Sequence, residues 1–318
     1  MSSRFVNPFT DLGFKIIFGQ PASKALLIIL LNELLSGEHH IEDLTFLDKE
    51  DRSENIHDKG IIYDLYCRTS AGEYIIVEMQ NRKHLNFVDR TLYYMCRAVS
   101  RQIEAPLAVE VHSPDDGEEG LEVREPSMSY GAIYKLHTVY GVFFMNFKEP
   151  DLPDRFRVDS GILDLESHET LNPHFRQIYL QFPYFTKELD ECSTLSDKLM
   201  YALKNMNNWN RMPDALKEQV FSHLDRLAAK AHLSEGDRIA YDKAVDRYNV
   251  SRIVENDIRE QAVAEGKAIG KAEGKAEGEA EGRLKGRLEI ARKLKENGFS
   301  IADIVRVAGL SAEEIDKL

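Results

Sequence analysis

The sequence predicts an α/β domain followed by an all-α C-terminal region. Runs rich in Ile, Val and Tyr, such as Ile61–Arg68 and Tyr74–Gln80, predict strands. Stretches with helical spacing of apolar residues alternate with these runs. From about Leu189 to Ala262 the pattern is helical and polar, and a glycine-periodic segment and a helical tail follow. The first part of the chain therefore predicts a sheet with helices, and the second part predicts helices alone.

The N-terminal region predicts two helices separated by a proline. Thr10 is a typical N-cap residue, and Gly37 closes the apolar pattern. Pro21 has no backbone N–H and interrupts a helix. We therefore expect a short helix to about Gly19 and then a longer, buried helix. A possible strand follows at Leu44–Asp48.

The middle of the chain predicts one more helix and two more strands. Asn86–Glu104 has helical spacing, whereas His112–Gly120 has the composition of a polar loop. Tyr134–Phe147 and Arg176–Phe185 are rich in aromatic and branched residues, which is typical of strands.

Composition and charge exclude several classes of protein. A chain of 318 residues holds one large domain or two, and a formal net charge of −13 argues against a generally basic nucleic-acid coat. A local basic face remains possible. Ala25–Leu35 is shorter than the ~20 residues of a membrane helix. The N-terminus lacks an apolar signal segment, and the three cysteines form no C-x-x-C motif. We expect a reduced, cytoplasmic protein with no membrane partner.

Two carboxylates interrupt the predicted strand pair. If residues 70–72 form a three-residue loop with Gly72 in the left-handed conformation, the register places Asp64 opposite Glu78. Gln80 then lies two residues further along the same face. An even-length loop would shift the register by one residue and separate the acids onto opposite faces. The position of Gly72 favours the paired register.

Like charges that face each other repel, and a divalent cation would relieve the repulsion. Asp64 and Glu78 are therefore candidate ligands of Mg²⁺ or Mn²⁺, which prefer carboxylate oxygens and water. A metal ion held there would polarise a phosphodiester and orient a water molecule. Gln80 carries no charge, so its expected role is to position water or a phosphoryl oxygen. The alternative is an amphipathic hairpin whose polar face simply meets water.

A second periodic feature lies near the C-terminus. Glycines recur at every fourth residue from Gly266 to Gly286, and alanines form a second ridge beside them. Two ridges of small side chains would let another helix approach closely, so we expect a homo-oligomer that pairs through this C-terminal helical region. The alternative is a charged, partly frayed linker, because each glycine costs a helix roughly 1 kcal/mol relative to alanine.

The tail after this segment predicts short helices. Gly298 and Gly309 each end a helical pattern, and Ser300 and Ser311 are plausible N-caps. Glu314 gives Ser311 the spacing of a capping box. The arrangement resembles a helix-turn-helix, although such short fragments also form small helical caps or dimer elements.

Several motifs occur together in the first third of the chain. They are D-x-x-F-K-x-x-F-G at Asp11–Gly19, Asp64, V-E-M-Q at Val77–Gln80 and D-R-T-L-Y-Y at Asp89–Tyr94. In combination they resemble the PD-(D/E)XK nuclease family transposases, also called recombination-promoting (Rpn) nucleases. The glycine tetrads and the helical tail are similar to this family too.

This resemblance implies a restriction-endonuclease-like core, a mixed sheet flanked by helices, and metal-dependent cleavage of DNA. Asp64 matches the family's metal-binding aspartate and Glu78 its second acid. Gln80 stands where the broader superfamily has lysine, which leaves the water-activating role unassigned. Asp11 matches the first-helix motif and is a further catalytic candidate, although an acid at a helix N-terminus also serves as a dipole partner.

The helix that follows the acids carries candidate DNA contacts. Arg90, Tyr94, Arg97 and Arg101 have the spacing of one helix face. They would contact the DNA backbone while the acids hold metal. For Tyr94 the alternative is a place in the core.

We therefore expect four regions: a nuclease-like domain at 1–188, a helical region at 189–262, a glycine-tetrad linker at 263–290 and a helix-turn-helix-like tail at 291–318. The leading hypothesis is a Mg²⁺-dependent DNA endonuclease with a role in recombination or in defence against foreign DNA. The first alternative is a catalytically silent DNA-binding or assembly protein with the same fold. The second is a nuclease that acts on RNA, because the same metal chemistry serves either backbone.

Overall fold

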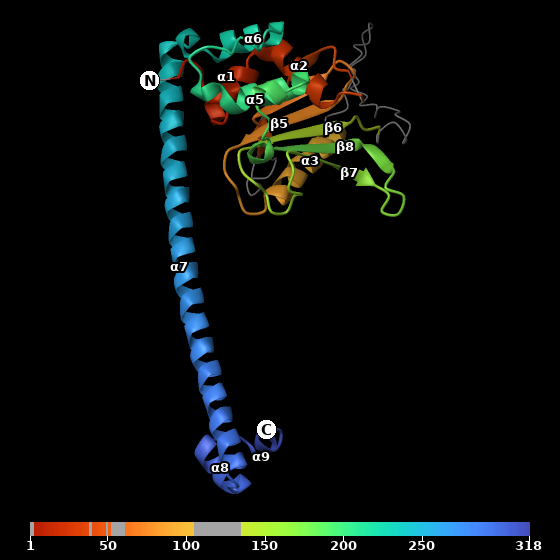
Figure 1. Ribbon diagram of the computed structural model, residues 1–318. Coiled ribbons are helices and arrows are strands. Elements are labelled where there is room, and N and C mark those ends of the chain that lie inside the picture. Colours follow the sequence, from red (N-terminus) through yellow and green to blue (C-terminus); the bar gives the residue numbers. More distant parts are fainter. Residues whose placement is uncertain (1–2, 38–39, 49, 52–60, 105–134) are drawn as a thin grey trace, which may run out of the picture. The chain divides into compact units, whose positions relative to one another are not determined.

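A computed structural model describes residues 3–37, 40–48, 50–51, 61–104 and 135–318 (Figure 1). The predicted polar loop at 112–120 lies outside these residues. The chain divides into two compact units, Met1–Asp246 and Arg247–Leu318. Helix α7 runs through the boundary, and each unit is described by itself.

The first unit is built on a mixed, six-stranded sheet, which confirms the predicted fold class (Figure 1). Neighbouring strands β5–β6 and β6–β8 are parallel, and the other neighbouring pairs are antiparallel. A separate short ladder joins β2 (Glu50–Asp51) to β3 (Ile61–Ile62). The six strands are, in sheet order, β1 (Leu44–Phe46), β4 (Leu65–Thr69), β5 (Tyr74–Gln80), β6 (Val139–Met145), β8 (Thr170–Gln181) and β7 (Arg157–Leu163).

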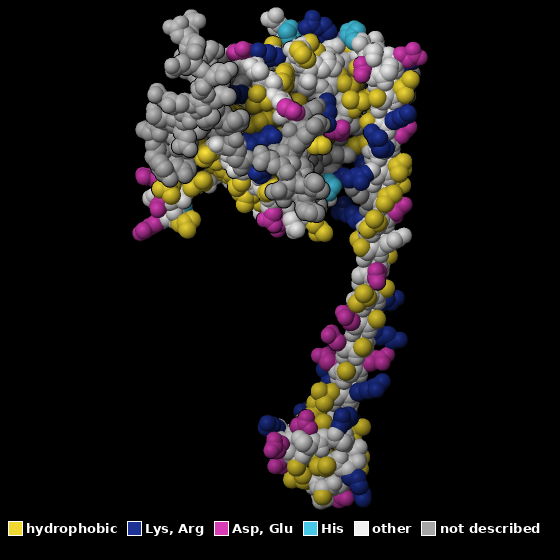
Figure 2. All heavy atoms as spheres, turned by 180° about the vertical axis from the view of Figure 1, so that it is seen from behind, with side chains coloured by type: hydrophobic (Ala, Val, Ile, Leu, Met, Phe, Trp, Pro, Cys, Tyr) yellow, Lys and Arg dark blue, Asp and Glu magenta, His cyan; other side chains and the backbone are white. Residues whose placement is uncertain are grey.

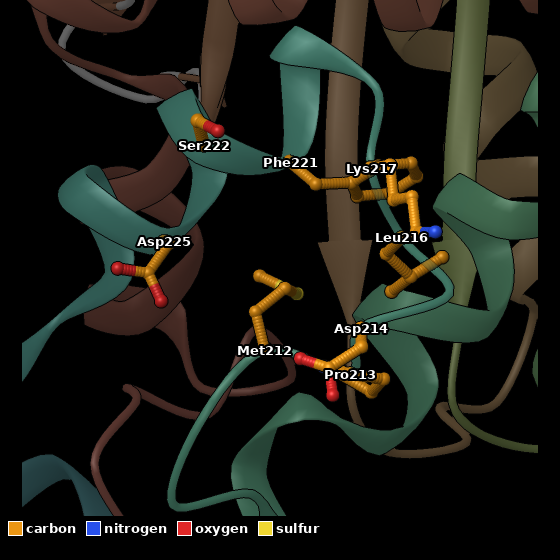
Figure 3. Close-up of a pocket in the computed structure, with 8 residues that line it drawn as sticks. All are labelled: Met212, Pro213, Asp214, Leu216, Lys217, Phe221, Ser222 and Asp225. Carbon is orange, nitrogen blue, oxygen red and sulfur yellow. The ribbon is translucent and has the colours of Figure 1, made fainter.

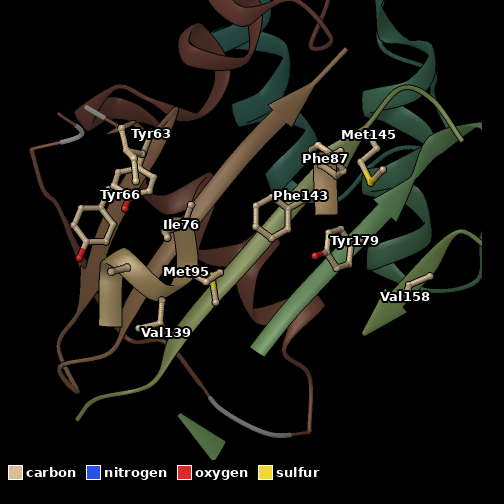
Figure 4. Packing of buried hydrophobic residues seen from close by; sticks show 12 residues of the cluster. Tyr63, Tyr66, Ile76, Phe87, Met95, Val139, Phe143, Met145, Val158 and Tyr179 are labelled. Atoms are coloured by element: carbon tan, nitrogen blue, oxygen red, sulfur yellow. The ribbon is translucent and has the colours of Figure 1, made fainter. Parts of the chain in front are cut away.

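Helices cover both faces of this sheet. Side chains alternate along a strand, and Phe143 of β6 joins a core cluster with α3 (Phe87–Glu104) (Figure 4). The next residue, Phe144, contacts Phe14 of α1 at 5.6 Å between ring centroids. The remaining helices of this unit are α1 (Asp11–Phe18), α2 (Lys24–Leu34), α5 (Leu195–Asn205) and α6 (Gln219–Ala228), with single 3₁₀ turns at Pro21–Ser23, Phe182–Tyr184, Leu189–Glu191, Met206–Asn208 and Lys230–His232.

The two N-terminal helices, their N-cap and the break at Pro21 are as the sequence analysis predicted. The Thr10 hydroxyl accepts a hydrogen bond from the Gly13 backbone N–H, as an N-cap does. The Pro21 turn separates α1 from α2, whose apolar side chains are buried. Among the described residues no single helix has the length and apolar content of a membrane span. Helix α1 and Pro21–Leu34 meet that test only as a pair bent by 67°.

Gly13 fixes the start of α1. A Cβ atom added there would lie 2.0 Å from the Asn7 carbonyl oxygen, a backbone atom that cannot move without distorting the turn. We therefore expect Gly13→Ala to lower the free energy of unfolding by roughly 3 kcal/mol. Gly236→Ala is the matched control, because that site lies in the first turn of α7 and a Cβ would meet only Ser234 Oγ at 3.9 Å. Urea unfolding measures both, and equal stabilities would contradict the prediction.

Two strands differ from the sequence prediction. The run Ile61–Arg68 is broken into β3 and β4, with a bend at Asp64. Strand β7 was not predicted, because Asp159, Ser160 and Gly161 disfavour a strand. It forms at the edge of the sheet, where β8 alone supplies its hydrogen-bond partners.

The predicted boundary at residue 188 does not separate two compact bodies. Helix α5 packs on α2, and α6 packs on both α1 and α2. The N-terminal segment also pairs with the end of α6, where the Val6 N–H donates to the Ala228 carbonyl at 2.8 Å. Burial of the apolar faces of α5 and α6, at about 1.5–3 kcal/mol for each large side chain, therefore joins them to the sheet domain. The division falls within α7 instead.

The second unit contains most of α7 (Glu235–Glu296), followed by α8 (Ile301–Ala308) and α9 (Ala312–Asp316). The glycine tetrads are helical throughout, as the first of the two sequence interpretations expected. Ser300 caps α8, and Ser311 with Glu314 forms the predicted capping box. The three helices enclose a small core of Ala291, Ile304, Ala308, Leu310 and Ile315.

Candidate active site

The hairpin between β4 and β5 has the register that pairs the two acids. Gly72 has φ +94°, and its N–H donates to the Thr69 carbonyl at 3.0 Å. Leu65 pairs with Val77 and Arg68 with Tyr74. The same register places Asp64 opposite Glu78. The predicted three-residue loop is therefore confirmed, and the alternative register with the acids on opposite faces is excluded.

Asp64 and Glu78 are joined by reciprocal hydrogen bonds. The Asp64 backbone N–H donates to Glu78 Oε1 at 3.0 Å, and the Met79 backbone N–H donates to Asp64 Oδ2 at 3.0 Å. Each carboxylate thus accepts a hydrogen bond from a backbone N–H of the neighbouring strand. These two bonds stand where hydrogen bonds between the strand backbones would otherwise form. This substitution explains why the strand bends at Asp64.

Burial raises the pKa of both acids. Glu78 is 4% exposed, and burial followed by the charge of Asp64 raises its pKa to about 8. Burial also raises the pKa of Asp64, against the opposing effects of the Met79 N–H and of Lys15. Two carboxylates that share a site of low polarity have this property. A cation beside them would favour their charged forms.

Helix α1 brings a third acid and a lysine to the site. The Lys15 ammonium lies 2.7 Å from Asp11 Oδ1 and 3.4 Å from Asp64 Oδ1. Burial alone would lower the pKa of Lys15, but the hydrogen bond to Asp11 and the charge of Asp64 raise it overall. Asp11 is therefore connected to the two central acids through Lys15. Its charge also raises the pKa of Asp64.

Helix α3 brings basic and aromatic groups from the opposite face of the sheet. The charge of Arg90 lowers the pKa of Glu78, and the charges of Glu78 and Asp64 contribute to the raised pKa of Tyr94, which burial chiefly causes. The Arg90 guanidinium lies over the rings of Phe87 and Tyr94, at 5.5 and 5.8 Å. Its buried Nε has no hydrogen-bond partner in the described part of the chain.

The other two candidate arginines, Arg97 and Arg101, lie further along α3 than Arg90. Arg97 and Arg101 follow Arg90 by seven and eleven residues on the same helix face, which places them roughly 10 and 16 Å along the axis. Tyr94 packs partly against the core cluster around Phe143, as the alternative from the sequence expected. The charges of Glu78 and Asp64 contribute to its raised pKa, and its contact with DNA stays a prediction.

Gln80 lies at the end of β5, beside the acids. Its side-chain amide is 3.5 Å from Glu78 Oε2, a long hydrogen bond. The amide is partly exposed and adds no charge. Its position is consistent with a group that orients a polar molecule at the carboxylates.

The donor set fits a magnesium or manganese ion held by few protein ligands. Asp64 and Glu78 supply hard carboxylate oxygens, and their mutual repulsion falls when a cation binds. No group of three or more His, Cys, Asp or Glu side chains among the described residues is arranged to hold a metal. Mg²⁺ commonly binds through one or two carboxylates and completes its coordination with water and substrate phosphate.

A hollow of about 460 Å³ elsewhere in the first unit has different chemistry (Figure 3). It lies between α6 and the loop before it, and Met212, Leu216 and Phe221 supply apolar lining. Its two carboxylates are already paired, Asp214 with Arg211 at 2.8 Å and Asp225 with Arg4 at 2.6 Å. None of the candidate site residues lines it.

The sequence analysis assigned no role to Lys15, although Lys15 is the lysine of the D-x-x-F-K motif that begins at Asp11. The signal was present, because Asp11 and Lys15 are four residues apart on a helix and form an i, i+4 pair. Such pairs are common on solvated helices, so the spacing alone did not indicate a site. The contact with Asp64, which lies 49 positions away in sequence, needs the packing of α1 against the sheet.

Comparison with known proteins supports the interpretation of this site. The family model described as "PD-(D/E)XK nuclease family transposase" matches residues 8–112 and 123–252. These ranges include α1, both central acids, Gln80 and the face of α3 that carries Arg90. No curated protein and no solved structure gives a significant match.

Proposed function

Because the chain belongs to the PD-(D/E)XK nuclease family transposases, we propose that it is a metal-dependent DNA endonuclease whose active centre is Asp64 and Glu78. The observation that carries the proposal is the reciprocal pairing of the buried Glu78 and the half-buried Asp64 through 3.0 Å hydrogen bonds between side chain and backbone. A hairpin that only presented a polar face to water would not bury both carboxylates.

Asp64 and Glu78 would hold Mg²⁺ or Mn²⁺. When bound, such an ion polarises the phosphodiester and stabilises the charge that develops on the leaving oxygen. Gln80 would orient the attacking water or a phosphoryl oxygen, since its amide can donate and accept but cannot take up a proton. Asp11 belongs to the same group through Lys15.

Helix α3 would contact the DNA backbone. Arg90 is the nearest candidate, because its buried Nε has no hydrogen-bond partner among the described residues and its charge already acts on Glu78. Arg97 and Arg101 would extend the contact with DNA along the same face of α3. Tyr94 would line the part of this face that is nearest to the acids. Contacts of this kind hold the phosphodiester in register and carry no base information.

We also propose that the protein self-associates through α7. The apolar side chains of Val250, Ile253, Val254 and Ile258 are each about half exposed or more. Their helical spacing puts them on one face, and Figure 2 shows hydrophobic side chains along this helix. A second copy presents the same stripe, so two copies of α7 would cover each other symmetrically.

The endonuclease proposal predicts nicking of supercoiled plasmid by the purified full-length chain. We expect conversion to open-circular DNA with Mg²⁺ or Mn²⁺ and none with EDTA, because the two acids need a cation to act on phosphate. Gel analysis of plasmid topology measures it, and the same assay on structured RNA tests the alternative substrate. Tight DNA binding without cleavage in either metal would favour the silent DNA-binding alternative.

A further inference from the structure

We propose that Lys15 supplies the positive charge that meets the scissile phosphate, with Asp11 as the residue that positions it. This inference rests on the proposed nuclease function. It assigns to Lys15 the positive charge that the neutral Gln80 cannot supply. It follows from where the Lys15 ammonium lies and from what surrounds it.

The ammonium lies between an outer and an inner acid. The side chain of Asp11 is 72% exposed and that of Asp64 is 13% exposed, and Lys15 contacts both. Lys15 itself is 28% exposed. A phosphate that approaches Asp64 from the Asp11 side would therefore meet Lys15 first. The Asp11 contact, at 2.7 Å, holds the ammonium there even when Asp64 takes another partner.

The charges near the site require a cation of this kind. Asp11, Asp64 and Glu78 are acids, and a phosphodiester adds a further negative charge. On the β5 strand the group next to Glu78 is the neutral Gln80 amide. Among the described residues, the Lys15 ammonium lies 3.4 Å from Asp64 Oδ1 on one side, and Arg90 belongs to α3, which packs on the other face of the sheet. Without Lys15 the side of the site that faces Asp11 would repel phosphate.

Lys15 keeps its proton in this role. A lysine ordinarily keeps its proton at neutral pH, and the 2.7 Å hydrogen bond to Asp11 Oδ1 favours the charged form. The ammonium therefore acts as a fixed donor and charge, and it takes no part in proton transfer. Fixed donors of this kind stabilise a transition state because they need no reorganisation during the reaction.

A purely structural role makes a different prediction. If Lys15 only neutralised Asp64, its removal would change stability and leave the cleavage step alone. If it meets phosphate, its removal would slow cleavage and leave metal affinity unchanged or higher, because an ammonium beside Asp64 repels a divalent cation.

The test compares Lys15→Met, Lys15→Arg and Asp11→Asn with the control Lys24→Met, all in the full-length chain. Lys24 pairs with Asp43 at 2.6 Å, and none of its contacts among the described residues is with Asp11, Asp64 or Glu78. Single-turnover nicking in Mn²⁺, plasmid affinity in Ca²⁺ and Mn²⁺ binding by calorimetry are measured for each, with thermal unfolding to confirm folding.

We expect Lys15→Met to slow single-turnover cleavage roughly 100-fold. Lys15→Arg restores most of the rate, Asp11→Asn gives an intermediate rate, and Lys24→Met matches the wild type. Mn²⁺ affinity does not fall in Lys15→Met. A wild-type cleavage rate for Lys15→Met, with Asp64→Asn inactive, would overturn this inference and leave the nuclease function standing. A loss of Mn²⁺ affinity in Lys15→Met would overturn it as well. A wild-type protein that binds Mn²⁺ but never cleaves would remove the nuclease function itself.

Discussion

Asp64→Asn and Glu78→Gln should each abolish DNA cleavage while the protein remains folded. Each change replaces a charged oxygen with an uncharged amide of the same size, so the pair can no longer hold a divalent cation. We expect the nicking rate to fall by at least roughly 10³-fold. The measurement is plasmid nicking in Mg²⁺ and in Mn²⁺, together with Mn²⁺ binding by calorimetry.

The two variants should lose cleavage activity without losing stability. Glu78 is buried beside the half-buried Asp64, and burial and the charge of Asp64 raise the pKa of Glu78 to about 8, so replacing this acid with an amide removes a cost in the metal-free protein. We expect the free energy of unfolding of Glu78→Gln to equal or exceed that of the wild type. Glu73→Gln is a useful control, because Glu73 is also a buried acid of the same hairpin. It lies at the loop end of the hairpin, where it accepts a hydrogen bond from the Thr69 hydroxyl. Full cleavage by Asp64→Asn or Glu78→Gln, in either metal, would end the catalytic assignment.

Val254→Asp should dissociate the proposed dimer. Val254 lies at the centre of the exposed apolar stripe on α7, next to Val250, Ile253 and Ile258. An aspartate there would place two unpaired carboxylates in the seam between copies. At roughly 3 kcal/mol or more for each buried charge, the dissociation constant should rise at least ~100-fold. Light scattering at micromolar concentration measures the mass of each variant.

Val263→Asp is the matched control for this change. Val263 is 50% exposed and Val254 is 49% exposed, so the two sites are equally open. Nine residues separate them, which is two and a half helical turns and puts them on opposite sides of α7. We expect the control to keep the mass of the wild type. A monomeric wild type, or equal dissociation by both variants, would show that this stripe does not pair copies of the chain.

The nuclease and the dimer predictions are independent of each other. Cleavage depends on residues of the first unit, and association depends on the exposed face of α7 in the second. A monomeric Val254→Asp variant that still nicks plasmid would show that one active centre is sufficient for nicking. Loss of double-strand breaks alone would indicate that two centres act on one duplex.

The glycine tetrads do not pack against anything within the described chain. A Cβ added at any glycine from Gly266 to Gly286 would have no neighbour within 4 Å. Six glycines in a helix cost it roughly 5 kcal/mol relative to alanine. The second unit offers no contact that offsets this cost, so the structure gives no explanation for the period of four.

The sequence by itself determined the features that depend on a few neighbouring residues. Gly72 fixed the hairpin register because a three-residue loop needs a left-handed residue at that position, and the register in turn paired Asp64 with Glu78. Thr10, Ser300 and Ser311 determined helix starts because a cap bonds to a backbone N–H only three residues away.

Only the tertiary structure decided which distant groups join the acids. Lys15 reaches Asp64 because α1 packs on one face of the sheet, and Arg90 acts on Glu78 because α3 packs on the other. The bend at Asp64, the edge strand β7 and the packing of α5 and α6 on α2 also arise from pairing between remote segments. Such contacts are stabilised by apolar burial over the whole unit, which no short stretch of sequence encodes. The sequence thus specified two carboxylates in register, and the fold decided that a lysine and an arginine from opposite faces accompany them.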